Sequence, residues 1–269
     1  MLKIEKFVTM SPEQWEIVIE GMRNPKNSWD RIDSYATHIE DPETLETAPF
    51  EFFVGENDMG LMEGLAKGGP VHAKYRRMMP VWLTINAPLY WWKEFDTYKI
   101  GTVTNSCSTM HKIHAKEFDL DDFSHDHLMS MDFHTDERDI PSVDVTPDGD
   151  GTILYTPAGL LGVTIKMLNK CRELYLKTKN KIYWWQMIQL LGTNYNQKRT
   201  VMLNYEVLHN IYESRKNHKL DEWHVFCDWI KELPYSELIT MAFDKPKDIV
   251  PETPPVELDE HQYSGLLEE

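Results

Sequence analysis

With 41% hydrophobic and 12% aromatic residues over 269 positions, the chain has the composition of an ordered globular protein that buries a sizeable core. Its formal net charge of −16 disfavours nucleic acid and membranes as partners, because an acidic surface repels nucleic-acid backbones and anionic lipid. A small anionic ligand is not excluded, since a few local arginines dominate the field at short range. No stretch approaches the ~20 apolar residues of a membrane span, and the three cysteines form no Cys-x-x-Cys pair. We therefore expect a soluble, cytoplasmic protein.

The first sixty residues predict short elements. Apolar and charged residues alternate over residues 2–10, which indicates a strand. Ser11 followed by Pro12 predicts the start of a helix, because serine caps helix ends well and proline fits the first helical position. Residues 24–49 are polar and broken by prolines, so only helical patches are expected there.

Residues 62–112 hold the stretch around which we expect the chain to be organised. A short helix is predicted at residues 62–66, and an apolar strand at residues 78–85. Pro80 restricts this strand to a sheet edge or to a start after the proline. A turn is predicted at Asn86-Ala87-Pro88, followed by a helix over residues 89–95 that is too aromatic to be exposed. The run of small hydroxyl and thiol residues after it either meets a ligand or caps another element.

The C-terminal half predicts mostly helices. Residues 116–151 are acidic and rich in turns, which suggests an insertion or surface subdomain. Helices are predicted from Thr156-Pro157 to residue 174 and over residues 182–191, 200–215 and 220–231. The last segment, 244–269, carries four prolines and eight acids against two lysines, which is typical of a loosely ordered tail. The sequence thus predicts one α+β domain over residues 1–243, with a mixed sheet and helices packed on it.

Several motif-based alternatives have little support. His111 and His114 lie near further histidines and aspartates, but their spacing matches no zinc pattern, so we expect no metal. Cys107 with His111 suggests a thiol nucleophile, yet no acid that would orient the histidine is evident. The phosphate-binding GxxxxGK[ST] and dinucleotide-binding GxGxxG motifs are both missing from the sequence.

A stronger signal comes from three polar residues on the helix predicted at 200–215. At ~100° per residue, Asn204, Asn210 and Arg215 fall within roughly 120° of one another. An arginine there suits a phosphate, and the two amides suit the edge of a heterocyclic ring. An ordinary solvent-facing side of the helix is the alternative reading of the same pattern.

The order of these features resembles the flavin-dependent thymidylate synthases. That family has a strand, an Ala-Pro turn, an aromatic helix and then Arg-His-Arg followed after seven residues by a serine. Residues 81–85 look like the strand, and Ala87-Pro88 looks like the turn. Thr97-Tyr98-Lys99 takes the place of Arg-His-Arg, and Cys107 falls at the serine position between Ser106 and Ser108. Asn105 stands where the family has a glutamate.

The resemblance resumes further along the chain and implies roles for single residues. His72 looks like the histidine of the family's His-Glu-Thr-Pro segment, and Trp223 looks like its Ala-Gln-Trp-Glu tryptophan. The resemblance makes His72, Lys99, Asn204 and Asn210 flavin-binding residues. It makes Asn105, Cys107 and Arg215 substrate-binding residues, with Arg215 on the nucleotide phosphate. Ser106, Cys107 and Ser108 line the reacting pyrimidine, and Arg76, Arg77 and Arg199 are candidates to replace the lost cations.

The resemblance also implies an activity and an assembly. A member of this family converts dUMP to dTMP by reductive methylation, using FAD, NADPH and methylenetetrahydrofolate, in a homotetramer with flavin sites between subunits. Two other readings stay open at this point. The chain is then either a non-catalytic nucleotide- or flavin-binding protein on the same fold, or a structural protein whose polar run only caps a helix.

Overall fold

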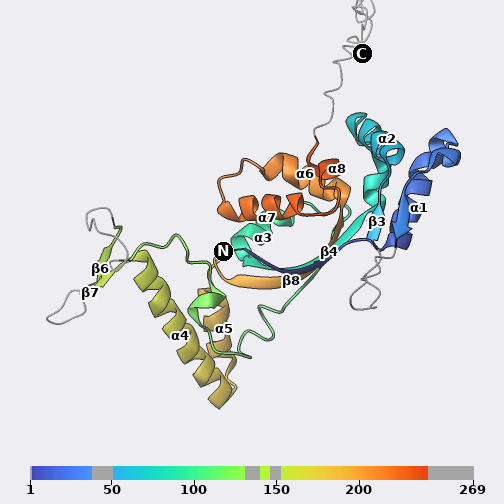
Figure 1. Ribbon diagram of the computed structural model, residues 1–269. Helices are drawn as coiled ribbons and strands as arrows, with labels where there is room; N and C mark the ends of the chain where they lie inside the picture. Colours follow the sequence, from blue (N-terminus) through green and yellow to red (C-terminus); the bar gives the residue numbers. More distant parts are fainter. Residues whose placement is uncertain (1, 38–50, 131–139, 146–152, 242–269) are drawn as a thin grey trace, which may run out of the picture.

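The computed structural model describes residues 2–37, 51–130, 140–145 and 153–241 (Figure 1). A four-stranded sheet with the order β1-β4-β8-β5 forms its centre. Its strands are β1 (Lys3–Val8), β4 (Pro80–Pro88), β5 (Val103–Ser106) and β8 (Asn196–Asn204). All the pairings between them are antiparallel, so the described sheet is antiparallel and not mixed as the sequence suggested.

Helices α3 (Leu89–Phe95), α6 (Tyr205–Arg215) and α7 (Asp221–Lys231) cover one face of this sheet (Figure 1). The aromatic face of α3 is fully buried as expected, and its Trp91 ring lies 4.7 Å from that of Trp223 on α7. Val81 and Leu83 of β4 and Val201 and Leu203 of β8 alternate inward to meet these rings. The α+β class predicted from the sequence is confirmed.

The remaining elements lie at the two ends of the sheet (Figure 1). At one end are α1 (Pro12–Arg23), α2 (Glu56–Lys67) and the hairpin of β2 (Tyr35–Thr37) with β3 (Glu51–Phe53). At the other end, α4 (Pro157–Thr178) and α5 (Lys181–Leu190) form a helical hairpin, with β6 (Val143–Val145) paired to β7 (Ile153–Tyr155) beyond it. Four short 3-10 helices and α8 complete the described part: η1 (Asn24–Lys26), η2 (Trp29–Arg31), η3 (Lys74–Met78), η4 (Leu120–Asp122) and α8 (Glu237–Thr240).

A second, smaller core fills the space under the helical hairpin. Phe118 and Phe123, from the acidic stretch after residue 116, are buried there against Leu161, Leu168 and Met187. Asn169 of α4 holds this stretch in place, since its side chain bonds both the N–H and the carbonyl of Phe118 at 2.8 Å. Residues 131–139, 146–151 and the expected tail 244–269 lie outside the described part, so the domain boundaries stay a prediction.

The position predicted for the strand at residues 78–85 within the sheet is wrong. Strand β4 is an inner strand between β1 and β8, not an edge, and it runs straight through the turn expected at Asn86-Ala87-Pro88. Pro80 and Pro88 stand at its first and last positions, where a missing N–H interrupts the ladder least. Strand formation without a break carries the chain directly into α3.

The helix expected at residues 200–215 begins only at Tyr205. Residues 200–204 end strand β8, where Val201 and Leu203 are buried and their neighbours are not, which is the two-residue period of a strand. Asn204 is the N-cap of α6, and its Oδ1 accepts a hydrogen bond from Val207 N–H at 3.0 Å. The prediction that Asn204 lies on the helix face with Asn210 and Arg215 is therefore wrong. Helix α2 is also longer than the expected residues 62–66.

Candidate functional site

A half-buried carboxylate, Glu94, organises the polar groups at the end of α3. Its Oε2 accepts hydrogen bonds from Arg215 Nη1 at 2.9 Å and from Trp223 Nε1 at 3.0 Å. The ring nitrogen Nε2 of His218 lies 3.4 Å from the same oxygen. Three elements are joined through this one oxygen, because Arg215 ends α6 and Trp223 belongs to α7.

Arg215 is oriented by contacts on both sides of its guanidinium. Its Nε donates to the Tyr98 hydroxyl at 2.9 Å, and its central carbon lies 4.9 Å from the Trp223 ring. Its Nη2 makes no hydrogen bond among the described residues, and 18% of the side chain is exposed. An oriented arginine with unused donors is suited to bind an oxyanion.

The loop after α3 is held against the start of α6 by Gly101. Gly101 has φ +80°, and a side chain there would lie 3.1 Å from Asn204 Nδ2 and Val207 Cγ2. Glycine accepts this left-handed conformation readily and lets the two segments approach closely. The loop that carries Tyr98 and Lys99 is thereby packed beside the amide of Asn204.

Below this loop lies a surface cavity of about 270 Å³. It is lined by Phe95, Asp96, Tyr98, Lys99, Thr102 and Thr104. Thr102 Oγ1 is buried and has no hydrogen-bond partner in the described part of the chain. Lys99 is exposed and makes no ion pair with any described residue. The cavity thus offers a free cation and an unused hydroxyl.

Arg199 of β8 lies beside the cavity at Lys99, because it pairs with the cavity residue Asp96. Its guanidinium pairs with Asp96 at 2.7 Å, donates to Gln197 Oε1 at 2.9 Å and lies 4.3 Å from the centre of the Trp92 ring. Gln197 Nε2 in turn donates to the Cys107 carbonyl at 3.0 Å. Of the three arginines considered as replacements for lost cations, Arg199 is therefore beside the site. Arg76 is fully buried in η3, and Arg77 donates to the Pro70 carbonyl.

The residues expected to line the pyrimidine lie on the outer strand of the sheet. Asn105 and Ser106 belong to β5, whose four residues are all exposed, and Cys107 and Ser108 follow directly. Side chains alternate along a strand, so Asn105 faces the opposite side from the cavity residue Thr104. The Cys107 N–H extends the ladder by donating to the Lys198 carbonyl at 2.9 Å.

The structure thus gathers only some of the residues chosen from the sequence. Lys99 lines the cavity, Arg215 reaches it through Tyr98, and Asn204 borders the loop above it. His72 instead packs beside Gly68 after α2, and Asn210 is exposed on α6. Sequence reasoning missed Glu94 and His218, whose only signal was a charged residue on an aromatic helix and a histidine just before the next one.

No described contact supports the two motif-based alternatives. Among the described residues, no group of three or more His, Cys, Asp or Glu side chains is arranged to hold a metal ion. His114 packs against the Tyr175 ring at 4.9 Å, and the His111 N–H bonds Ser108 Oγ. Across residues 2–37, 51–130, 140–145 and 153–241, no helix has the length and apolar character needed to cross a membrane.

Solved structures with the same fold include those of a thymidylate synthase and a UMP/dUMP methylase. Thymidylate Synthase X (ThyX) from Helicobacter pylori, solved with FAD and dUMP, aligns with a TM-score of 0.53 at 13% identity over 89% of this chain and 97% of its own. A UMP/dUMP methylase, PolB from Streptomyces cacaoi, solved with 5-Br dUMP, aligns with a TM-score of 0.50 at 13% identity over 91% and 95%. The fold is that of the flavin-dependent thymidylate synthases. No protein-family model matches the chain, and no curated protein does.

This result separates what is shared from what is specific to the chain. At 13% identity the likeness extends to the backbone arrangement, which includes the sheet and the covering helices. A likeness at this identity says nothing of the side chains at the end of α3, so their chemistry is argued from Glu94, Arg215 and the cavity at Lys99.

Proposed function

We propose that the chain is a flavin-dependent, nucleotide-binding enzyme of the thymidylate synthase type. Its substrates are then dUMP, NADPH and methylenetetrahydrofolate, with FAD as cofactor and dTMP as product. The observation that carries the proposal is Arg215, which is oriented by Glu94 and Tyr98 and keeps Nη2 unused, on a fold shared with FAD- and dUMP-bound enzymes.

The residues present fit an anionic nucleotide and a flavin in part. Arg215 offers a guanidinium to a phosphate, and Lys99 offers a second positive charge beside Thr102 Oγ1, which lacks a partner among the described residues. Asn204 stays a candidate for the flavin beside Lys99, although its Oδ1 already caps α6, so only its Nδ2 is left to donate. When bound, reduced FAD supplies the hydride for the reductive methylation.

The protein groups serve to bind and orient in this proposal. Charge-assisted hydrogen bonds to a phosphate contribute ~1.5–3 kcal/mol each, so Arg215 and Lys99 together account for most of the anion binding. Holding the pyrimidine against the flavin is the larger contribution to rate, because orientation replaces a bimolecular encounter. Cys107, Ser106 and Ser108 keep their proposed place near the pyrimidine, with no nucleophilic role required.

Optical titration with FAD and then dUMP tests the proposal. We expect the purified protein to bind FAD with a shifted visible spectrum, to bind dUMP, and to form dTMP with NADPH and methylenetetrahydrofolate. Arg215→Ala should weaken dUMP binding roughly tenfold or more, whereas Lys93→Ala, an exposed lysine on α3, should leave it unchanged. Failure to bind FAD in the presence and absence of dUMP would exclude the function.

A second candidate is a non-catalytic flavin- or nucleotide-binding protein. It is favoured by Tyr98, which stands where the family has histidine and whose hydroxyl is already bonded to Arg215. Ligand binding without dTMP formation supports this candidate, and dTMP formation rules it out.

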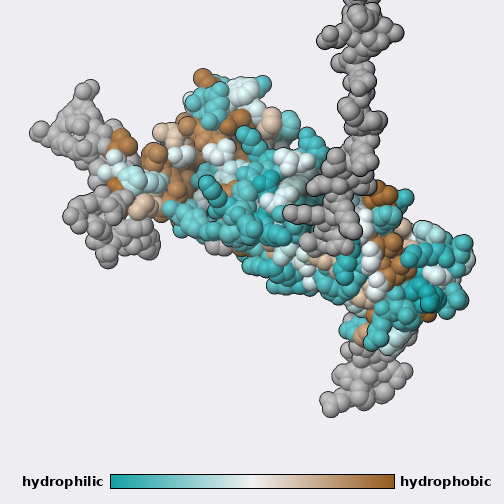
Figure 2. Space-filling view, turned by 90° about the horizontal axis from the view of Figure 1, so that it is seen from above, coloured by the Kyte–Doolittle hydropathy of each residue, from teal (hydrophilic) through white to brown (hydrophobic). Residues whose placement is uncertain are grey.

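We also propose that the chain assembles as a homotetramer. The helical hairpin exposes Leu160, Val163 and Met167 at spacings of three and four along α4, with 57%, 39% and 51% of their surfaces accessible. Figure 2 shows hydrophobic surface gathered on the side of the molecule where this hairpin lies. An apolar helix face of this kind is suited to bury itself against another copy. Light scattering of the purified protein gives the mass, and a monomer at micromolar concentration would refute the proposal.

A further inference from the structure

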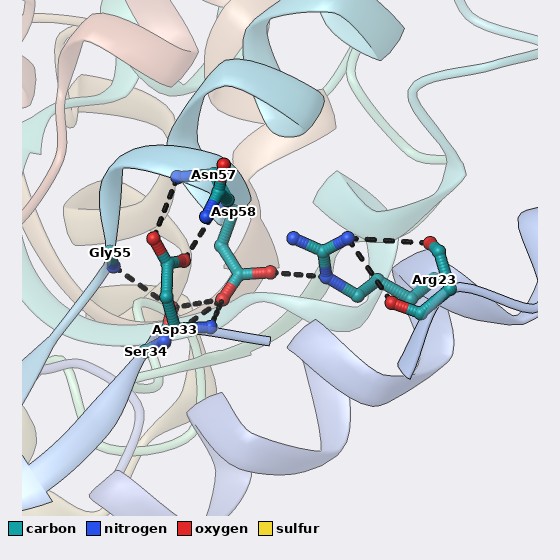
Figure 3. A network of polar contacts seen from close by, with 7 residues as sticks. Arg23, Asp33, Ser34, Gly55, Asn57 and Asp58 are labelled. Carbon is teal, nitrogen blue, oxygen red and sulfur yellow. Dashed lines mark hydrogen bonds and ion pairs between the residues drawn. The ribbon is translucent and has the colours of Figure 1, made fainter. Parts of the chain in front are cut away.

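A second cluster of cations lies at the other end of the sheet, between α1 and α2. Arg23 is the last residue of α1 and is 3% exposed. Its Nε donates to Asp58 Oδ1 at 2.5 Å, and its Nη1 donates to the Ser28 carbonyl and Oγ at 3.3 Å each (Figure 3). Asp58 is fixed by Ser34 and by the Asp33 N–H, so Arg23 sits in a rigid frame.

One end of this guanidinium has no partner among the residues that the structure describes. Arg23 Nη2 is buried and makes no hydrogen bond within the described ranges, and in Figure 3 it carries no dashed line, unlike the other two guanidinium nitrogens. Leaving a buried donor unpaired is unfavourable, and more so when the group is charged. An acceptor from outside the described chain would remove this cost.

The Arg23 side chain lines a surface cavity of about 310 Å³. The other lining residues are Lys26, Ser28, Arg31, Asn57 and Leu61. Lys26 and Arg31 are exposed and make no ion pair with a described residue. Among the residues that the structure describes, this lining holds three cations, a hydroxyl and an amide, with no carboxylate, on a chain whose net charge is −16. Such a local reversal of sign concentrates anions at this point.

We propose that this cavity is a binding site for the phosphate group of a small phosphate ester. Asp58 neutralises Arg23, which leaves the two charges of Lys26 and Arg31 to balance a phosphate of −1.5 to −2 at neutral pH. Arg31 supplies a planar fork for two phosphate oxygens, and Ser28 and Asn57 supply further donors. The volume, at the lower end of small-molecule pockets, leaves room for an organic group beside the phosphate.

The proposed phosphate site is independent of the proposed enzymatic function. No described residue lines both its cavity and the one at Lys99. Binding there therefore does not require Arg215 or a flavin, and the two proposals fail separately.

Calorimetric titration with glycerol 3-phosphate, inorganic phosphate and glycerol tests the site. We expect saturable binding of one glycerol 3-phosphate per chain, weaker binding of inorganic phosphate and none of glycerol. The double variant Lys26→Gln/Arg31→Gln should lose roughly tenfold or more in affinity, because both charged contacts go. The matched control Lys166→Gln/Lys177→Gln removes two exposed lysines of α4 and should bind as the wild type does.

Four results would overturn the proposal. These are no saturable binding by the wild-type protein, an equal loss in the control variant, inorganic phosphate binding as tightly as the ester, and loss of the binding in Arg215→Ala. The last would place the ester in the candidate active site instead. Both substituted positions are exposed, so the folded state of the double variant is checked simply by its unchanged melting temperature.

Discussion

Two arginine–carboxylate pairs of the same chemistry occupy opposite ends of this molecule, and they differ in how much water reaches them. In the first pair, the side chains of Arg23 and Asp58 are 3% and 0% exposed. In the second, those of Arg215 and Glu94 are 18% and 34% exposed, next to a cavity. The first joins α1, α2 and the loop between them, and the second joins α3, α6 and α7.

Because the two pairs differ in burial, we expect one to contribute to stability and the other to ligand binding. A buried carboxylate must have all its lone pairs occupied, and Asp58 Oδ2 accepts from the N–H groups of Asp33 and Ser34 and from the Ser34 hydroxyl. Glu94 is screened by water, so its contribution to stability is small. We infer that the Asp58 pair holds the fold and that the Glu94 pair sets the charge and orientation of a ligand-binding arginine.

Removing the buried charge should have the largest effect on folding. Asp58→Asn leaves Arg23 charged and uncompensated, which should lower the free energy of unfolding by about 3–5 kcal/mol. Urea unfolding followed by circular dichroism measures it. The control Glu63→Gln breaks an exposed pair with Lys67 at 3.9 Å and should change stability by less than about 0.5 kcal/mol. Equal effects of the two substitutions would contradict the assignment.

The same carboxylate should also make stability depend on acid. Burial raises the pKa of Asp58, but hydrogen bonds from Ser34, Asp33 and Arg23 outweigh it, so the pKa is lowered from 3.8. Stability from this group is then complete above the unfolded value and is lost as pH falls through the lower folded value. Unfolding measured between pH 5 and about 2 should show this loss in the wild type, and Asp58→Asn should lack that part of it.

Neutralising the exposed pair should act on ligand binding instead. Glu94→Gln keeps an acceptor for Arg215 but removes a negative charge 2.9 Å from it, so dUMP should bind roughly threefold or more tightly. The gain should shrink as salt is raised, because the site is partly exposed. Stability should change by about 1 kcal/mol or less.

Fluorescence titration with dUMP at two salt concentrations measures this effect. Glu213→Gln, also on α6, breaks an exposed pair with Lys216 at 2.8 Å and serves as the control. If Glu94→Gln binds dUMP with unchanged affinity at low salt, Arg215 does not hold the phosphate.

Local signals were enough to predict the helices that begin with a strong cap. Ser11 forms a capping box with Gln14, and Thr156 accepts from the Gly159 N–H, so α1 and α4 begin where the sequence predicts. The apolar run at residues 200–204 was misread because so short a run fits a helix or a strand equally well. The run forms a strand because it pairs with β4, which lies more than a hundred residues away in the sequence.

Polar networks were less predictable than helices for a related reason. Asp33 caps α2 from 24 and 25 residues away, by accepting from the N–H groups of Asn57 and Asp58. No motif marks such a pair, and the same holds for Glu94 and Arg215, which are 121 residues apart. The resemblance to a family did select Lys99, Asn204 and Arg215, which lie around one loop in the fold. Such a resemblance follows the backbone arrangement, which is kept among proteins whose side chains differ.

Gly101 offers the finest test of the comparison, because it shifts the binding loop without touching either ion pair. Gly101→Ala forces a side chain into φ +80° and within 3.1 Å of Asn204 and Val207, which should cost about 1–2 kcal/mol of stability. Since Tyr98 and Lys99 are on this loop, FAD and dUMP binding should weaken together with stability.

Gly162→Ala, inside α4 with open space around it, should instead stabilise by about 0.5–1 kcal/mol and leave binding unchanged. Thermal unfolding measured with and without ligand separates the effect on stability from the effect on binding. Normal ligand binding in Gly101→Ala would mean that this loop is not part of the site.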